Sequence, residues 1–294
     1  MDRESKVEKS ESVFGRLSGD SISEILSRTS PLDASRFAII SKGFKSVSGL
    51  DTVWEKFVPM EILSRSVVSP PLLYHGGTKK ELFFSLCNSP ILIDGAKLSF
   101  FLDKKSGKKC FTVGARELII SWGDNPDYWI WTSHPDSRFS EVAQLKIVCW
   151  LDIRGKIKTD MLSQKTNYKA YLIYKFATAI YGLESMYSVV RLVNHEADSE
   201  AEERATLVHP HRGHPMYRHP MPRQPGRLPV RRDDGWMEIE MGDFYNELGD
   251  DGEVEARLME IWRLHGKAGL IVEGIEFRPS TSLNRRNDAI RRTT

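Results

Sequence analysis

The stretch Lys109-Cys-Phe-Thr-Val-Gly-Ala-Arg-Glu-Leu-Ile-Ile-Ser-Trp-Gly-Asp-Asn-Pro-Asp-Tyr-Trp-Ile-Trp131 decides the fold of this chain. It places three of the seven tryptophans within ten residues, around a turn of Gly123, Asp124, Asn125 and Pro126. Strand-forming residues lead into the turn, so the pattern predicts a hairpin with aromatic rings at its tip. Two interpretations are open from the pattern alone. The rings fill a β core, as large aromatics commonly do, or they face solvent and give a sugar a flat surface to stack on.

From residue 91 onward, the chain has the alternation of β-strands. Within 145–154, one apolar face is formed by Leu145, Ile147, Cys149, Leu151 and Ile153, in alternation with Lys146, Val148, Trp150, Asp152 and Arg154. The same period of two recurs within 170–176 and 237–241, and Gly269–Pro279 is typical of a last strand. Short strands between turn signals predict an antiparallel β-sandwich of the jelly-roll kind.

One stretch, 196–234, interrupts the strands. It begins with acidic residues and continues with many prolines, which cannot supply the hydrogen bonds of a sheet, so we predict a flexible insert. The insert also carries His209, His211, His214 and His219. Because no cysteine or carboxylate completes a ligand set and the prolines leave no rigid scaffold, we predict no metal site there.

The first part of the chain has helical spacing. Ser21 and Glu24 stand as a possible capping box, and Ser30 followed by Pro31 predicts a second helix that runs through about Lys42. Asp51 is expected to cap a third short helix, and Lys79–Cys87 predicts another helical segment. A helical unit of this size is marginal by itself, so it either packs on the remaining chain or presents apolar surface to another protein.

Composition narrows the class of protein. The 294 residues are 40% hydrophobic and 28% charged, which is typical of globular chains of one or two domains. A formal charge of +2 argues against a general nucleic-acid binder, and no apolar run is long enough to predict a membrane span. Three widely spaced cysteines predict buried thiols in a reducing compartment, and the charged first residues do not resemble a secretion signal. We therefore expect the cytoplasm and nucleus, with no cofactor.

An enzymatic alternative comes from two carboxylates beside a tryptophan. Glu238 and Glu240 would share one strand face with Trp236, as a glycosidase could require. Hydrolysis needs one carboxyl group with a raised pKa and one that is ionised, and the sequence shows no such difference between them. We interpret both as exposed strand carboxylates, and we predict no catalytic residue and no enzyme.

The tryptophan-rich stretch resembles the opening of the Nictaba-type lectin domain, the phloem protein 2 family of plants. The resemblance is carried by Ala115, Arg116, Glu117, Leu118, Ile120, Trp122, Tyr128 and Trp129. It implies a carbohydrate site for GlcNAc oligomers or N-glycan cores, with Trp122 and Trp129 as stacking rings and Glu253 and Glu260 as acceptors for sugar hydroxyls. Residues seven apart in an uninterrupted strand point to opposite faces, so either a bulge intervenes near Glu253 or only one glutamate reaches the sugar. After Glu260 the chain departs from the family, which commonly has a tryptophan just before the lysine at position 267, whereas here Trp262 comes earlier.

The helical part resembles an F-box, which implies docking on the Skp-type adaptor of a cullin-RING ubiquitin ligase. The resemblance nominates the adaptor-binding residues Leu17, Ile22, Ile25, Leu26, Pro31, Leu32, Phe37, Phe44 and Trp54. One departure is that Ser18 follows Leu17 where an F-box usually has proline, whose fixed φ would set the entry into the first helix.

The two resemblances together predict a two-domain α+β chain. We expect a disordered N-terminus at 1–13, an F-box at 14–60, a helical linker at 61–90, a lectin domain at 91–279 containing the 196–234 insert, and a basic tail at 280–294. The predicted function is that of a non-catalytic, glycan-reading adaptor in an SCF-type ligase, with no nucleic-acid or membrane partner. Two alternatives stay open: an adaptor whose β domain binds a protein, and a nucleocytoplasmic stress lectin without a ligase role.

Overall fold

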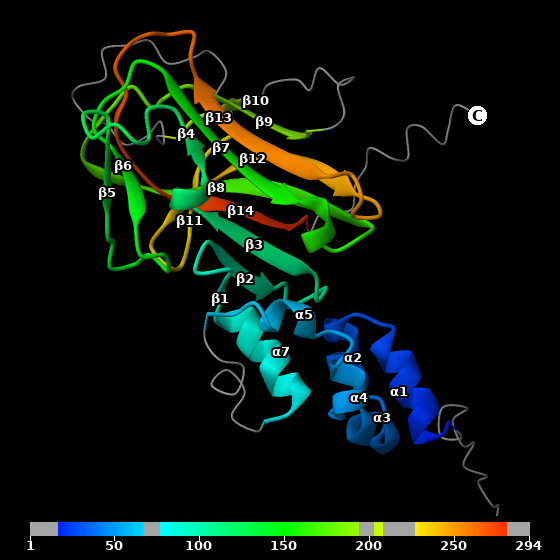
Figure 1. The fold of residues 1–294 in the computed structure, drawn as a ribbon. Helices are drawn as coiled ribbons and strands as arrows, with labels where there is room; N and C mark the ends of the chain where they lie inside the picture. Colours follow the sequence, from blue (N-terminus) through cyan, green and yellow to red (C-terminus); the bar gives the residue numbers. More distant parts are fainter. Residues whose placement is uncertain (1–16, 68–76, 194–202, 208–226, 281–294) are drawn as a thin grey trace, which may run out of the picture. The chain divides into compact units, whose positions relative to one another are not determined.

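The computed structural model of the chain describes residues 17–67, 77–193, 203–207 and 227–280. The chain forms two compact units (Figure 1). Unit 1 comprises Met1–Ser64, Val68–Ser89 and Lys104–Gly107, and unit 2 comprises Arg65–Val67, Pro90–Asp103 and Lys108–Thr294. The predicted disorder at 1–13, the four histidines from 209 to 219 and the basic tail beyond residue 280 lie outside the described residues. Within the described ranges, no helix is long and apolar enough to cross a membrane.

Unit 1 is helical and has its own aromatic core. Its described helices are α1 (Gly19–Ser27), α2 (Pro31–Phe37), α3 (Lys42–Val47), α4 (Asp51–Trp54), α5 (Met60–Leu63) and α7 (Lys79–Asn88). The fully buried Trp54 lies 5.3 Å from the ring of Phe83 and donates its indole N–H to the carbonyl of Ser48 at 2.7 Å. Helix α7, which falls in the predicted linker, therefore packs on α4 as part of this unit.

The helix boundaries correct several expectations. The side chain of Ser18, and not that of Ser21, caps α1, since it accepts the backbone N–H of Ser21. Ser30 caps α2 with proline at the first helical position, as predicted, but α2 ends at Phe37 and α3 is a separate helix. Asp51 is the first residue of α4 and does not cap it. Several short polar side chains near a helix start can each serve as its N-cap, so the sequence alone does not fix the first residue of the helix. Tertiary packing determines which of them caps it.

Unit 2 consists of two antiparallel sheets. The nine-stranded sheet contains β1 (Ile91–Ile93), β2 (Leu98–Leu102), β3 (Lys109–Gly114), β14 (Ala268–Pro279), β8 (Thr166–Tyr181), β12 (Met237–Asn246) and β11 (Val230–Arg231) in that order, with β6 (Val142–Leu145) beside β14 and β5 (Trp129–Thr132) beside β6. The five-stranded sheet has the order β10 (Glu203–Ala205), β9 (Met186–Leu192), β13 (Glu253–Glu260), β7 (Leu151–Lys158) and β4 (Ile119–Ile120).

The two sheets face each other across the core of unit 2. A Cβ built on Gly155 of β7 would lie 3.0 Å from the side chain of Ile275 of β14, and one on Gly242 of β12 would lie 2.8 Å from Val190 of β9. The two layers are visible in Figure 1, where β7 and β13 lie over β8 and β14. The inward-facing residues alternate along each strand, as in β7, where Leu151, Ile153 and Ile157 are buried. The predicted antiparallel β fold is confirmed.

Two parts of unit 2 differ from the sequence pattern. The alternation over 145–154 predicted one strand, but β6 ends at Leu145 and β7 begins at Leu151, and the link between them exposes Ile147 and Trp150. The prediction of a flexible insert at 196–234 is wrong at its described parts, because 203–205 forms β10, Leu207 is fully buried, and 230–231 forms β11.

The cysteines of both units also differ from the prediction. Their predicted burial holds only for Cys110, since Cys87 is half-buried and Cys149 is exposed.

Candidate carbohydrate-binding site

The site begins at the turn between β4 and β5, where Trp122 has a left-handed backbone. Its φ is +63°, a region that large side chains rarely adopt, and 59% of the residue is exposed. Backbone hydrogen bonds surround it, from Gly123 N–H to Ile120 O at 2.9 Å and from Asn125 N–H to Trp122 O at 3.0 Å. A strained, solvent-facing indole persists only where its surroundings hold it, and such positions are common at binding sites.

The structure does not place Trp129 at the surface, so its prediction as a stacking ring is wrong. Only 1% of Trp129 is exposed, and its indole N–H donates to the carbonyl of Ser121 at 3.1 Å. The half-buried Trp131 makes a similar bond to the carbonyl of Gly123 at 2.9 Å. The hairpin thus contains both a buried and a solvent-facing ring, because the buried Trp129 and the half-buried Trp131 bind the backbone of the turn that holds Trp122 outward.

A hollow lies beside the exposed indole. It has a volume of about 430 Å³ and is lined by Ser121, Trp122 and Trp150, and Trp150 is 45% exposed. Tyr128 lies near the same ring, with centroids 5.9 Å apart. Two indoles and a hydroxyl around a hollow of this size are suited to the apolar face and hydroxyl rim of a sugar ring.

A second hollow borders Trp122 and is more polar. Its volume is about 580 Å³, and the turn residues that line it include Asp124, Asn125 and Asp127. The side chains of Asp124 and Asp127 are exposed, while Asn125 uses its side-chain oxygen to accept the N–H of Asp127 at 2.9 Å. These carboxylates can accept hydrogen bonds from sugar hydroxyls, a role that the sequence analysis gave to other acids.

Trp150 is a site residue that the sequence analysis missed. The alternation of 145–154 assigned it to the polar face of one continuous strand, which gave no reason to pair it with Trp122. In the structure it precedes the first residue of β7, and Ser121 donates its backbone N–H to the carbonyl of Asp152 at 3.0 Å. That bond joins the turn to the start of β7 and so places the two indoles around one hollow.

The two predicted glutamates do not join this site. Strand β13 pairs with β7 from Glu253 to Glu260 without a register shift, so the two side chains point to opposite faces. Seven residues separate them by about 23 Å along the strand, and Glu253 lies at the far end, with Lys156 at 3.7 Å. Glu260 is fully buried and cannot meet a ligand. The prediction of both as sugar acceptors is therefore wrong.

Glu260 instead holds the loop that follows β13. One carboxylate oxygen accepts the backbone N–H groups of Trp262 at 3.2 Å and Arg263 at 2.9 Å. At the end of the same loop, the fully buried Lys267 donates its ammonium group to the carbonyls of Cys149 at 2.7 Å, Arg263 at 2.6 Å and His265 at 3.0 Å. Burial lowers the pKa of Lys267, and the charge of Glu260 opposes this effect. The lysine ties the loop to the segment that carries Trp150.

Polar groups lie on the solvent side of the five-stranded sheet, close to the indoles. Asp152 accepts hydrogen bonds from Arg154 at 2.6 Å and from Arg257 at 2.8 Å. Burial opposes the ionisation of Asp152, but these two guanidinium groups outweigh it and lower the pKa of the carboxyl. Arg154 keeps 34% of its side chain exposed, so it has donors left for a hydroxyl group.

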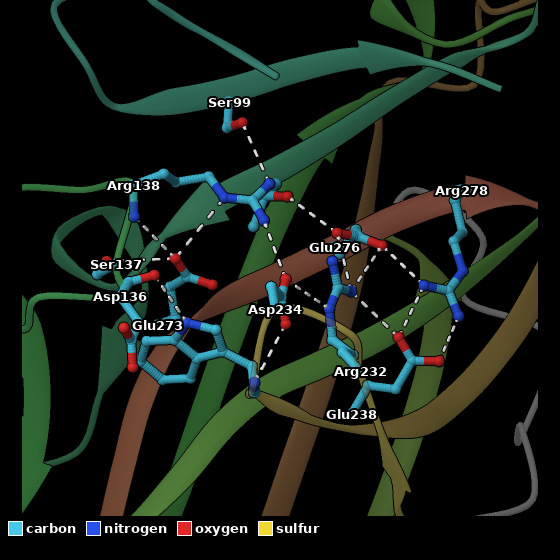
Figure 2. A network of polar contacts seen from close by, with 12 residues as sticks. Ser99, Asp136, Ser137, Arg138, Arg232, Asp234, Glu238, Glu273, Glu276 and Arg278 are labelled. Atoms are coloured by element: carbon cyan, nitrogen blue, oxygen red, sulfur yellow. Dashed lines mark hydrogen bonds and ion pairs between the residues drawn. The ribbon is translucent and has the colours of Figure 1, made fainter. Parts of the chain in front are cut away.

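The pair of acids weighed for hydrolysis belongs to a different arrangement. Figure 2 shows a network over the nine-stranded sheet in which Arg232 and Arg278 lie between Glu238 and Glu276. Glu238 is 12% exposed, so its predicted exposure is wrong. Burial opposes its ionisation, but Arg278 and Arg232 lower its pKa. Glu240 pairs with Lys169 at 2.8 Å. These contacts join β8, β12 and β14 to one another and to the turn that carries Arg232.

In unit 1 the predicted adaptor-binding residues divide into two groups. Ile22, Leu26, Pro31, Phe44 and Trp54 are buried and form the core of the unit, so they cannot themselves contact another protein. Leu17 and Ile25 are exposed, and Leu32 and Phe37 are partly exposed. Further exposed apolar residues of the described helical unit, which the prediction did not include, are Ile39, Ile40, Leu50 and Met60.

Two facing antiparallel sheets form a β-sandwich, and exposed indoles at one end of it line a candidate ligand site. Residues 108–279 match the family described as phloem protein 2, and the chain belongs to this family. Among its relatives in Arabidopsis thaliana, F-box protein PP2-B10 is 40% identical over 96% of this chain and 100% of its own length. F-box protein At2g02240 is 42% identical over 92% of this chain and 82% of its own length. The predicted resemblance to plant F-box proteins with a phloem protein 2 domain is confirmed.

Solved structures give weaker matches. A family 35 carbohydrate binding module from Clostridium thermocellum has a TM-score of 0.33 and 11% identity, over 58% of this chain and 98% of that one. A Podospora anserina GH26-CBM35 β-(1,4)-mannanase has a TM-score of 0.34 and 11% identity, over 60% of this chain and 29% of that one. Scores of this size do not establish a common fold.

Proposed function

We propose that the chain is the substrate-recognition subunit of an SCF-type cullin-RING ubiquitin ligase, acting in the cytoplasm and nucleus. Unit 1 would bind the Skp-type adaptor, and unit 2 would bind GlcNAc oligomers or N-glycan cores on target proteins. Ubiquitin transfer itself would be catalysed by the partners. The family membership and the F-box names of the relatives support the first role.

The carbohydrate role rests on one observation, the exposed Trp122 in a left-handed backbone beside Trp150. The indoles of Trp129 and Trp131 fix the turn, and Lys267 holds the segment of Trp150, so neither stacking ring has to be ordered when a ligand arrives. Preorganised rings bind more tightly, because the entropy of ordering them has already been lost on folding. Exposed carboxylates and guanidinium groups nearby supply hydrogen bonds to hydroxyls.

The adaptor role rests on apolar side chains that unit 1 does not bury. Ile39 is 89% exposed, Ile40 53%, Leu50 48% and Ile25 42%. Single exposed apolar residues are common, but several on one small helical unit give a partner apolar area to cover. Ile25 lies on α1, and Ile39 and Ile40 follow α2.

The sugar role is tested by calorimetric titration of the full chain with chitotriose. Trp122→Ala should abolish binding and leave the melting temperature unchanged, because most of the ring is in solvent. Ile130→Ala serves as the matched control, since Ile130 is an exposed apolar residue of the same hairpin at 42% and does not line either hollow. A wild-type chain that binds neither chito-oligosaccharides nor N-glycan cores refutes the sugar role.

The adaptor role is tested by co-precipitation with a Skp-type adaptor. Ile25→Asp and Ile39→Asp should each reduce recovery of the adaptor, whereas Ile130→Asp in unit 2 should not. If the chain binds the adaptor but no glycan, the result would favour recognition of a protein by unit 2. Glycan binding without any recovery of the adaptor would favour a stress lectin without a ligase role.

A further inference from the structure

A third exposed indole, after Trp122 and Trp150, lies at the same end of the five-stranded sheet as the hollow lined by Ser121, Trp122 and Trp150, here called the Trp122 hollow. Trp262 is 53% exposed and follows the last residue of β13, Glu260, by two positions. Glu260 pairs with Leu151 of β7, whose preceding residue is Trp150. Trp150 and Trp262 therefore both lie beyond the last paired residues of neighbouring strands, at one end of the sheet.

The ring of Trp262 rests on an aromatic neighbour. It meets the ring of Tyr187 of β9 edge-on, with centroids 4.9 Å apart, and the guanidinium group of Arg204 lies 5.9 Å from the centre of the tyrosine ring. Tyr187 pairs with Met259, and Met259 pairs with Asp152, so these three residues form one row across β9, β13 and β7. The row connects Trp262 to the polar groups around Asp152.

The position of Trp262 is fixed by its backbone. Its N–H donates to Glu260, and Lys267 binds the carbonyls of Arg263 and His265 in the same loop. The buried charged groups of Glu260 and Lys267 thus hold a loop that carries an exposed indole. The cost of ordering the ring is thus met by folding, as it is for Trp122.

We propose that Trp262, supported by Tyr187, is a second stacking subsite, and that the ligand is an extended oligosaccharide whose chain crosses the ends of β4, β7, β13 and β9. This inference rests on the proposed carbohydrate role of the Trp122 hollow. Trp150 lies at the end of β7 and Trp262 leans toward β9, so about two strand spacings, roughly 10 Å, separate the subsites. A single sugar fills the first subsite only, and a longer chain reaches both. Arg154 and Arg257 lie along the path and donate to its hydroxyls.

The test is a titration of the full chain with chito-oligosaccharides of increasing length. The affinity of the wild type should rise with oligomer length. Trp262→Ala should raise the Kd of the longest oligomer about tenfold and change the Kd of the shortest less than twofold. Trp262→Phe should restore most of the affinity for long oligomers, which distinguishes stacking from a folding defect. Leu264→Ala is the control, because Leu264 is 65% exposed in the same loop and is not aromatic.

Two outcomes would overturn the inference. If Trp262→Ala binds every length as the wild type does, the second subsite is refuted and the Trp122 site stands. If the wild type binds no oligosaccharide of any length, the carbohydrate role and this inference fail together.

Discussion

Replacement of Lys267 by methionine should destabilise unit 2 strongly. The ammonium group of Lys267 is fully buried and donates to three backbone carbonyls, at 2.7, 2.6 and 3.0 Å. Methionine keeps a similar chain length and removes all three donors. The carbonyls of Cys149, Arg263 and His265 would then be left without these partners, and Glu260 would lose a nearby positive charge.

The magnitude follows from the balance of these contacts. A buried acceptor that loses its partner costs about 1–3 kcal/mol, so three of them give roughly 3–9 kcal/mol as an upper range. Removing the buried ammonium recovers part of this, because its desolvation already lowers the pKa of Lys267. Water can also reach part of a loop that has opened. We expect a net loss of about 3 kcal/mol in the free energy of unfolding of unit 2.

Urea unfolding followed by tryptophan fluorescence measures this loss, since unit 2 holds every tryptophan except Trp54. Lys169→Met is the matched control: Lys169 makes a single ion pair with Glu240 at 2.8 Å and is 25% exposed, so its loss should cost at most about 1 kcal/mol. The Lys267 variant should also weaken oligosaccharide binding, because its loop and the segment of Trp150 lose their common tie. A cost below about 1 kcal/mol, equal to the control, would refute the assigned role of Lys267.

Four further substitutions have expected outcomes. Trp129→Phe should cost about 2 kcal/mol from one lost hydrogen bond and a smaller ring, and should weaken sugar binding because the turn of Trp122 loosens; unchanged binding in a titration would contradict this. Trp54→Ala should cost about 3–5 kcal/mol and melt unit 1, as followed by circular dichroism at helical wavelengths, and melting of unit 1 at the wild-type temperature would refute it. Burial raises the pKa of Glu273 above its unfolded value, so the stability that its protonated carboxyl group contributes is lost as pH rises through the folded pKa. Glu273→Gln should therefore stabilise the protein at pH 7. The pKa of Glu238 is lowered despite burial, so the stability that its ionised carboxylate contributes is present above the unfolded pKa and is lost on acidification. Glu238→Gln should therefore destabilise the protein at pH 7 and converge with the wild type in acid. Melting scans at pH 7 in which Glu273→Gln lowers the melting temperature, or Glu238→Gln raises it, would refute the assignment.

The sequence predicted the antiparallel fold because strand alternation is a local signal, carried by β8, β12 and β14 in consecutive residues. It could not tell Trp122 from Trp129, since both lie near the hairpin tip and only the left-handed backbone at Trp122 turns one ring outward. The alternation before Leu151 concealed Trp150, because a period of two continues through a link that is not a strand.

The glutamates illustrate a different limit. The period of β13 alone indicated that Glu253 and Glu260 point to opposite faces, and the unshifted pairing with β7 agrees. What the period could not show is that Glu260 lies in the interior and holds a loop. The partners of Glu260 follow it closely in the chain, but their backbone N–H groups leave no trace in residue type.

The central place of β14 in the nine-stranded sheet has a consequence for biosynthesis. This strand pairs with β3, β8 and β6, yet it is formed by residues 268–279. The ribosome must therefore have added residues 268–279 before the larger sheet can close, whereas the helices of unit 1 depend mainly on segments that are synthesised earlier. During most of translation, unit 1 could already be folded while the sheets of unit 2 remain open and prone to aggregation. We therefore expect the nascent chain to depend on a chaperone.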